Sequence, residues 1–101
     1  MDTYNQNRLT IIGPARDLNK FDRDERWLTV AGARHLELLE HSRERHAWQF
    51  ETDAGPPEFL RVLSRQWQNL TFLLDYDCEV QRLKGLVKAR NGRLRHYRVS
   101  Y

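Results

Sequence analysis

The stretch from Leu70 to Asp77 constrains the fold most, because large apolar residues occupy every second position in it. These residues share one side of an extended chain: Leu70, Phe72, Leu74 and Tyr76. A period of two is typical of a β-strand with one buried face. Further along, Asn91-Gly92 is the strongest two-residue signal for a β-hairpin turn. The sequence therefore predicts an antiparallel sheet that includes a hairpin over residues 83–99.

The N-terminal part carries a strand signal followed by a helix signal. Residues 7–13 alternate between polar and apolar side chains, which predicts a strand that buries Leu9 and Ile11. The strand ends on Gly-Pro, and proline is tolerated in the first turn of a helix because its missing N–H needs no partner there. Leu18 and Phe21 then lie three residues apart, on one face of the predicted helix.

The middle of the chain is less regular. Residues 24–34 show little period, and we interpret them as a connection. Residues 35–52 favour a hairpin whose return arm places Trp48 and Phe50 on one face. The first arm, residues 35–41, also fits a helix.

A second helix is expected after the break at residues 53–57, which ends on Pro-Pro. Its apolar residues recur on one helical face: Phe59, Leu60, Leu63 and Trp67. The predicted order is thus strand, helix, hairpin, helix, strand and terminal hairpin. We interpret it as α+β, a ferredoxin-like βαββαβ with an extra C-terminal hairpin strand and two helices on one face of an antiparallel sheet. With 101 residues there is room for one such domain, over residues 1–101.

Charge is distributed unevenly along the chain. Residues 1–79 hold 10 Lys/Arg against 14 Asp/Glu, whereas residues 80–101 hold seven Lys/Arg and no acid. A basic segment of this kind binds phosphates or an acidic protein surface. The candidate contacts with nucleic acid or a partner are Arg82, Lys84, Lys88, Arg90, Arg93, Arg95, Tyr97 and Arg98.

Parity divides these candidates between the two faces of the hairpin. On the first strand one side holds Arg82, Lys84, Lys88 and Arg90, and the other holds Leu83, Val87 and Ala89. On the second strand Arg93, Arg95 and Tyr97 share one side, and His96 and Arg98 the other. Cations beside Tyr97 and Tyr101 suit a phosphate backbone with a base stacked on a ring. The alternative interpretation is that Tyr97 and Val99 pack in the core and that the arginines are merely solvated or protect an edge strand.

Composition narrows the class of protein. Apolar residues make up 40%, charged residues 31%, and the mean hydropathy is −0.82, as in a polar globular chain. No apolar run is long enough for a membrane helix, and residues 1–4 lack the pattern of a signal peptide. Cys78 is the only cysteine, which excludes an internal disulfide and a multi-cysteine zinc site. We expect a soluble cytoplasmic protein with no cofactor.

Several motifs occur together in a recognisable order. They are residues 7–14, the aromatic strand that runs into Pro-Pro over residues 48–57, Leu63-Ser64, Leu70-Thr71-Phe72, Tyr76 and Gly85. Their order resembles the YubB-type ferredoxin-like domain of uncharacterised plasmid and phage proteins, over roughly residues 7–90. The chain departs from that pattern in residues 27–34, and at Cys78 and Arg82, where the family favours acids and glycines. The resemblance implies the fold and a mobile-element origin, and transfers no catalytic residue.

Histidines and acids offer only weak candidates for a metal or catalytic site. His41 and His46 flank the turn of the predicted hairpin and can meet across it, but the sequence supplies no convincing third ligand. We therefore predict neither a metal site nor catalytic residues. The acids beside Cys78 disfavour the thiolate form of its side chain. Because the thiolate is the nucleophilic form, a nucleophilic role for Cys78 is not expected. Three acids on one side of this strand end are expected to be solvated: Asp75, Asp77 and Glu79.

An enzymatic alternative comes from the C-terminal segment. Residues 83–99 faintly resemble the closing strands of RelE-type ribonuclease toxins, which cleave messenger RNA on the ribosome. That resemblance implies candidates for phosphate contact and proton transfer, namely Arg93, Arg95, His96 and Tyr97. Such toxins usually begin with helices, however, whereas this chain begins with a predicted strand.

The sequence as a whole predicts a small non-catalytic binding module encoded by a phage or another mobile element. Its expected partner is nucleic acid, through the basic hairpin, or a host protein, through the open sheet face or an edge strand. One such host protein would be a defence complex that the module inhibits. The RelE-type ribonuclease is the alternative hypothesis.

Overall fold

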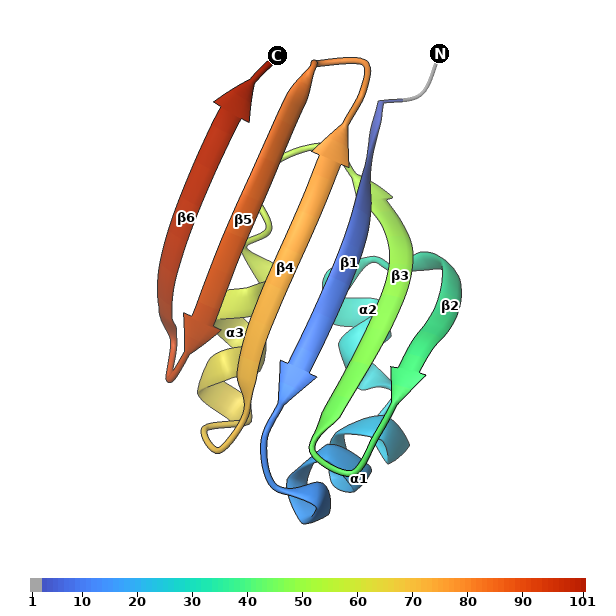
Figure 1. Cartoon of the computed structure of the whole chain (residues 1–101), viewed down its shortest axis with the longest axis vertical. Coiled ribbons are helices and arrows are strands. Elements are labelled where there is room, and N and C mark those ends of the chain that lie inside the picture. Colours follow the sequence, from blue (N-terminus) through green and yellow to red (C-terminus); the bar gives the residue numbers. More distant parts are fainter. Residues whose placement is uncertain (1–2) are drawn as a thin grey trace.

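The computed structural model describes residues 3–101, in which the chain forms six strands and three helices (Figure 1). The strands are β1 (Tyr4–Ile12), β2 (Arg34–His41), β3 (Arg45–Asp53), β4 (Thr71–Cys78), β5 (Leu83–Arg90) and β6 (Arg93–Ser100). The helices are α1 (Ala15–Arg23), α2 (Arg26–Ala31) and α3 (Phe59–Gln66). None of these helices is long and apolar enough to cross a membrane. The expectation of no signal peptide rests partly on residues 1–2, which lie outside the described residues.

All six strands belong to one sheet with the order β2-β3-β1-β4-β5-β6, in which every neighbouring pair is antiparallel. The predicted α+β class and antiparallel sheet are therefore confirmed. Two details differ from the predicted βαββαβ arrangement. Two short helices, not one, connect β1 to β2, and the terminal hairpin adds two strands after β4 where the arrangement had one. The ferredoxin-like topology accordingly stays a prediction.

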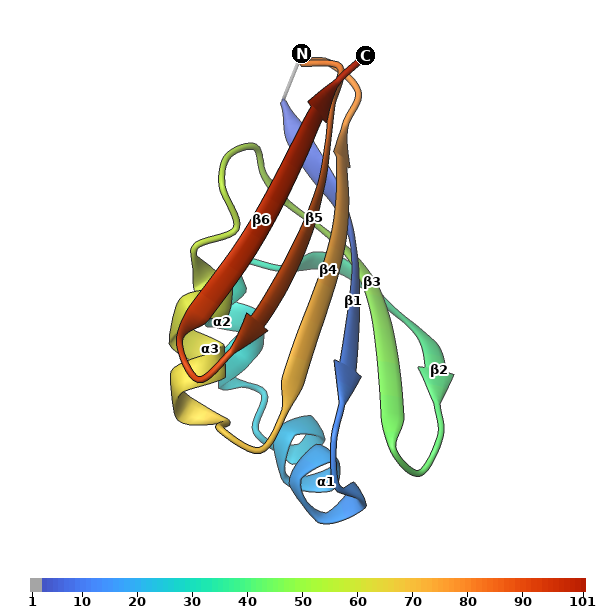
Figure 2. The ribbon, with the colours of Figure 1, turned by 60° about the vertical axis from the view of Figure 1, so that its left-hand side comes forward.

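The helices lie on one face of the sheet, and no helix within residues 3–101 covers the other face (Figure 2). The core forms between the helices and the facing side of the sheet, where alternate strand positions are fully buried. It includes Leu9 and Ile11 of β1, Leu18 and Phe21 of α1, Leu60 and Leu63 of α3, and Phe72 and Leu74 of β4. The prediction of which side of each of these strands and helices is buried is thereby confirmed. The opposite face of the sheet stays open to solvent.

Residues 24–34, which we interpreted as a connection, contain the helix α2. Its buried side chain is Trp27, whose ring stacks on Phe21 with centroids 5.4 Å apart. The helix ends at Gly32, where a φ of 67° is a left-handed conformation that glycine adopts without strain. With six residues and one buried side chain, α2 has no apolar repeat that would reveal it in the sequence.

The ambiguous segment 35–41 forms the strand β2, so its interpretation as a helix is wrong. β2 pairs with β3 and lies at the edge of the sheet, with two irregularities in its register. Three of its leucines are about 40% exposed or more: Leu36, Leu38 and Leu39. An edge strand without a fully buried face has little need for strict alternation, which is why its sequence pattern was ambiguous.

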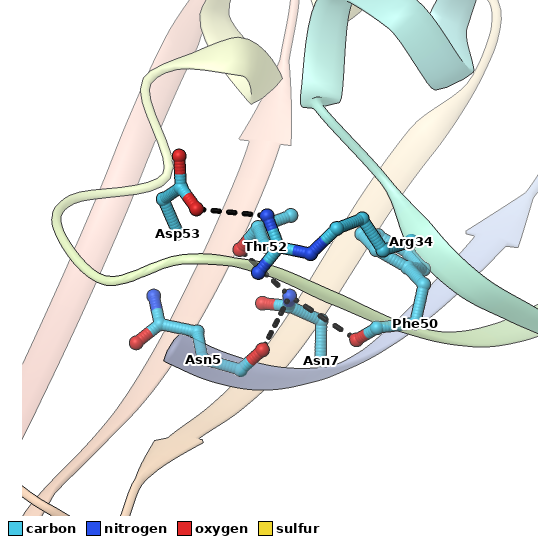
Figure 3. A network of polar contacts seen from close by, with 6 residues as sticks. All are labelled: Asn5, Asn7, Arg34, Phe50, Thr52 and Asp53. Atoms are coloured by element: carbon cyan, nitrogen blue, oxygen red, sulfur yellow. Dashed lines mark hydrogen bonds and ion pairs between the residues drawn. The ribbon is translucent and has the colours of Figure 1, made fainter. Parts of the chain in front are cut away.

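One end of the core is polar, although the sequence pattern gave no sign of it. Asn5 and Asn7 of β1 have the same parity as Leu9 and are buried beside Thr52. Asn7 Nδ2 donates hydrogen bonds to Thr52 Oγ1 at 2.9 Å and to the carbonyl oxygens of Asn5 and Phe50, each at 3.3 Å (Figure 3). These bonds compensate for removing the Asn7 Nδ2 group from water, whereas Asn7 Oδ1 is buried without a hydrogen-bond partner among residues 3–101.

Candidate nucleic-acid interface

The hairpin of β5 and β6 turns at Asn91-Gly92, as predicted. Both residues have positive φ, 52° and 76°, which a type I′ turn requires. The turn is attached to helix α3, because the Gly92 N–H donates to Ser64 Oγ at 2.9 Å. In addition, Arg61 Nη1 donates to the Gly92 carbonyl at 3.1 Å. Helix α3 thus fixes the position of this end of the hairpin.

The pairing of β5 with β6 places five cations on the open face. Val87 and Ala89 point toward the helices and are buried, so β5 residues of the opposite parity point away. Residues directly opposite one another on β5 and β6 lie on the same side of the sheet. The β6 partners of these outward-pointing β5 residues therefore also point away from the helices. We call these cations the basic face: Lys84, Lys88, Arg90, Arg93 and Arg95.

Two other predicted contacts do not lie on the basic face. Arg82 precedes β5 and belongs to the turn after β4, with a φ of 51°. Arg98 pairs with Gly85, so it projects from β6 on the side of the helices. Sequence parity had grouped Arg82 with the first strand because the strand start was not known. It had correctly separated Arg98 from the arginines of the basic face.

Like charges oppose one another directly on the basic face. By register Lys88 pairs with Arg95 and Arg90 with Arg93, although Arg90 Nη1 donates a hydrogen bond to Thr71 Oγ1 of β4 at 2.7 Å. Directly opposed like charges destabilise a sheet by roughly 0.2–1 kcal/mol per pair. Within residues 3–101, none of the five cations of the basic face forms an ion pair. Lys88, Arg90, Asn91, Arg93 and Arg95 together line a shallow hollow of about 530 Å³. The described residues that line this hollow are four cations and one asparagine, so it is suited to an anion, whereas Lys84 lies apart from it, opposite Asp77 of β4.

Apolar and aromatic side chains adjoin the cations on the same face. Leu86 pairs with Tyr97, and the exposed fractions of these residues are 48% and 64%. Val99 pairs with Lys84 and is 65% exposed. The alternative in which Tyr97 and Val99 pack in the core is therefore wrong, because β6 is an edge strand and no helix lies over this side of it. The exposed ring of Tyr97 is accessible to a planar partner.

Tyr101, the other aromatic candidate for stacking, is already engaged. Its hydroxyl donates to Asp77 Oδ1 at 2.7 Å, and its ring lies 5.2 Å from Lys84 Nζ. The hydrogen bond to Asp77, together with desolvation, raises the pKa of Tyr101 to about 12. Tyr97 is therefore the better stacking candidate of the two.

The acids and the cysteine at the end of β4 do not come together as a metal-ligating group among the described residues. Asp75 and Glu79 are exposed. Within residues 3–101, their carboxylates and that of Asp77 do not form a group of three donors close enough together to bind one metal ion. Cys78 is fully buried, which keeps its thiol from solvent.

The candidates implied by the RelE-type resemblance lie on two faces. Arg93, Arg95 and Tyr97 project to the open side, whereas His96 projects toward the helices and pairs with Val87. There its Nε2 is 2.6 Å from the Tyr76 hydroxyl. One face of β6 therefore does not bring all four side chains together.

The position of His96 leads to a testable prediction on its protonation. Desolvation, followed by the charge of Arg98, lowers the pKa of His96 below its ordinary value. We expect an NMR pH titration of the His96 ring to give a midpoint below about 6.5. In Arg98→Gln the midpoint should rise. As pH falls, the His96 ring takes up its proton at a higher pH in the unfolded chain than in the folded chain. The contribution of neutral His96 to stability is therefore present above about pH 6.5 and is lost as pH falls through the lowered pKa.

The matched control for this titration is Arg93→Gln, which removes a charge from the other face of the same strand. It should leave the His96 midpoint nearly unchanged. A midpoint at or above the ordinary histidine value, or equal shifts in both variants, would contradict the prediction.

One group of metal-ligating side chains does converge, contrary to the sequence prediction. The rings of His41 and His46 stack across the β2–β3 turn with centroids 4.0 Å apart. The third ligand that the sequence did not reveal is Asp22, in the last turn of α1. Asp22 was missed because it is distant in the sequence and only the packing of α1 brings it to the hairpin.

Comparisons with family models, with curated proteins and with solved structures found no significant match. The resemblance to the YubB-type family accordingly stays a prediction.

Proposed function

We propose that this protein is a non-catalytic module that binds single-stranded nucleic acid through the open face of β5 and β6. The observation that carries the proposal is the pair of opposed like charges, Lys88 with Arg95 and Arg90 with Arg93. A phosphate backbone laid along the hairpin would relieve this repulsion and release counterions. Cations on an edge strand such as β6 also discourage pairing with another sheet, but that role does not require the cations of two neighbouring strands to oppose one another.

The aromatic residue on the same face favours a single strand over a duplex. Bases of a single strand are free to stack on an exposed ring, and Tyr97 offers one beside the cations. A duplex keeps its bases stacked internally and would use the cations alone. Binding without sequence preference is expected, because a stacked ring accepts any base.

The proposal is tested by fluorescence anisotropy with labelled single-stranded RNA, single-stranded DNA and duplex DNA. If all five cations of the basic face contact phosphates, affinity for a single strand should fall about 100-fold between about 50 and 200 mM salt. The single strands should bind more tightly than the duplex. Absence of binding at low salt, or binding that does not respond to salt, would overturn the proposal.

A separate prediction concerns the aromatic contact. Tyr97→Ala should weaken binding of single-stranded RNA by about 1–3 kcal/mol, since that is the usual effect of losing one stacked base. The slope of affinity against salt should not change, because the substitution removes no charge. Tyr4→Ala removes a partly exposed tyrosine of β1 outside the hairpin and serves as the control. Equal losses in both variants would contradict a stacking role for Tyr97.

A second candidate function is binding to a host protein, and a specific observation favours it. The edge strand β2 exposes three leucines, Leu36, Leu38 and Leu39. Exposed apolar side chains along a strand at the edge of the sheet suit an added strand from another protein. Such binding would tolerate moderate salt and would be lost in Leu36→Ser/Leu38→Ser, whereas the nucleic-acid proposal requires that this variant bind RNA normally. The mobile-element origin and inhibition of host defence depend on this candidate and on the family resemblance alone.

A further inference from the structure

We propose that Asp22, His41 and His46 form a binding site for a divalent transition-metal ion, with Zn²⁺ as the best fit. The site lies at the end of the molecule where α1 meets the β2–β3 turn, and none of its residues belongs to the basic face. Each residue comes from a different element: the last turn of α1, the end of β2 and the start of β3. A bound ion would therefore connect the helix layer to the hairpin.

The distances between the donor atoms suit a single ion. His46 Nδ1 is 2.9 Å and His41 Nε2 is 3.1 Å from Asp22 Oδ2, and all three donors lie within 4.8 Å of one another. A tetrahedral zinc ion with bonds of about 2.0–2.2 Å holds neighbouring ligand atoms about 3.3–3.6 Å apart. The two imidazole rings are stacked at an interplanar angle of 20°, and an imidazole nitrogen binds a metal ion in its own ring plane, so the His41 ring must rotate out of the stack to admit the ion. His41 is an exposed residue, so this rotation does not disturb the core.

The hydrogen bonding of His46 is the second, independent observation. His46 is 1% exposed, and its Nδ1 has no hydrogen-bond partner among residues 3–101, although Asp22 Oδ2 is close. The distance is short, but the alignment is not that of a hydrogen bond. Asp22 Oδ1 is likewise buried and unpartnered within that part of the chain. Buried polar atoms are normally satisfied, and an ion coordinated by Nδ1 would satisfy the one on His46.

The chemistry of the donors selects the class of ion. Two imidazole nitrogens and one carboxylate favour zinc and neighbouring transition metals over Mg²⁺ and Ca²⁺, which prefer oxygen ligands only. Three protein ligands leave a fourth position for water. That position is accessible from solvent, since the His41 side chain is 53% exposed. The site thus accepts an ion without opening the core.

The experiment is titration of the untagged full chain with Zn²⁺ by isothermal calorimetry, paired with thermal unfolding. We expect one ion per chain and, at about ten times the Kd, a rise in Tm of roughly 5–10 °C. Titration with Co²⁺ should produce visible absorption bands of a four-coordinate site with nitrogen and oxygen ligands. Mg²⁺ should give neither effect.

Variants distinguish Zn²⁺ binding at this site from nonspecific Zn²⁺ binding by surface histidines. Asp22→Asn and His41→Ala should each weaken Zn²⁺ binding at least about tenfold and remove the rise in Tm. Because His41 is an exposed residue, His41→Ala should retain the fold, which circular dichroism checks. The control is His35→Asn, since His35 is exposed and has a φ of 54° that asparagine also accepts. Absence of Zn²⁺ binding by the native chain, or an equal loss in His35→Asn, would overturn the proposal and leave an Asp22-bridged histidine pair.

Discussion

Neutralising the four cations around the Asn91-Gly92 turn is expected to weaken binding of single-stranded RNA about 100- to 1,000-fold at 0.1 M salt. The variant carries Lys88→Gln, Arg90→Gln, Arg93→Gln and Arg95→Gln. Each phosphate contact with a single strand adds about 0.7 to the slope of log K against log salt concentration, so four lost contacts reduce that slope by about 2.8. Anisotropy titrations at several salt concentrations measure both quantities.

The same variant should not lose stability. It replaces two directly opposed like-charge pairs by neutral side chains, which relieves repulsion within the hairpin. We therefore expect its Tm to equal or exceed that of the native chain. Loss of binding together with a preserved Tm separates a binding role from a folding role, a distinction that binding data alone do not make.

The control for this experiment is a second variant with the same change in net charge. It carries Arg16→Gln, Lys20→Gln, Arg23→Gln and Arg43→Gln, all exposed residues of α1 and the β2–β3 turn. Because these cations lie outside the hairpin, we expect RNA affinity to fall by less than about tenfold, through long-range attraction alone. If both variants bind equally weakly, net charge rather than the basic face governs binding, and the proposed interface is wrong.

The largest effect on stability is expected from Phe21→Ala. Phe21 is fully buried, and its ring lies within 5.4–5.6 Å of Trp27, Trp67 and Phe72. Truncation would leave a cavity among four elements of the structure and remove three aromatic contacts. We expect the free energy of unfolding to fall by about 3–5 kcal/mol, a large part of the total for a domain of this size. Urea unfolding followed by tryptophan fluorescence measures the change.

Tyr97→Ala is the matched comparison, because it removes an aromatic ring that is exposed. Its effect on the free energy of unfolding should stay within about 0.5 kcal/mol. The two variants thus have opposite profiles: Phe21→Ala should lose stability, while Tyr97→Ala should lose RNA affinity. A similar loss of stability in both would mean that Tyr97 is packed and not available for stacking.

Features encoded by a local period were predictable from the sequence. The alternation over residues 70–77 gave the buried side of β4, and Asn91-Gly92 gave the turn between β5 and β6. The shared face of Arg93, Arg95 and Tyr97 followed from the same period of two. Neighbouring positions on a strand point to opposite sides whatever the rest of the fold is, so these statements needed no tertiary information.

Features that depend on what covers a residue were not predictable. Asn7 has a polar side chain at a buried position, where Thr52 and backbone carbonyls accept hydrogen bonds from its Nδ2. Trp27 belongs to a helix too short to show a repeat, and it is buried because Phe21 lies against it. The sequence pattern records the period of a segment and not the identity of its neighbours.

The sequence by itself thus determined the α+β class, the buried side of each regular strand, and which cations share a side within each strand of the terminal hairpin, since each follows from spacing along the chain. Only the tertiary structure decided that β2 and β6 are edges, that Tyr97 is exposed, and that Asp22 meets His41 from 19 residues away. These outcomes depend on which elements pack together. Contacts between distant residues are set by the shape of the whole core, which no local pattern specifies.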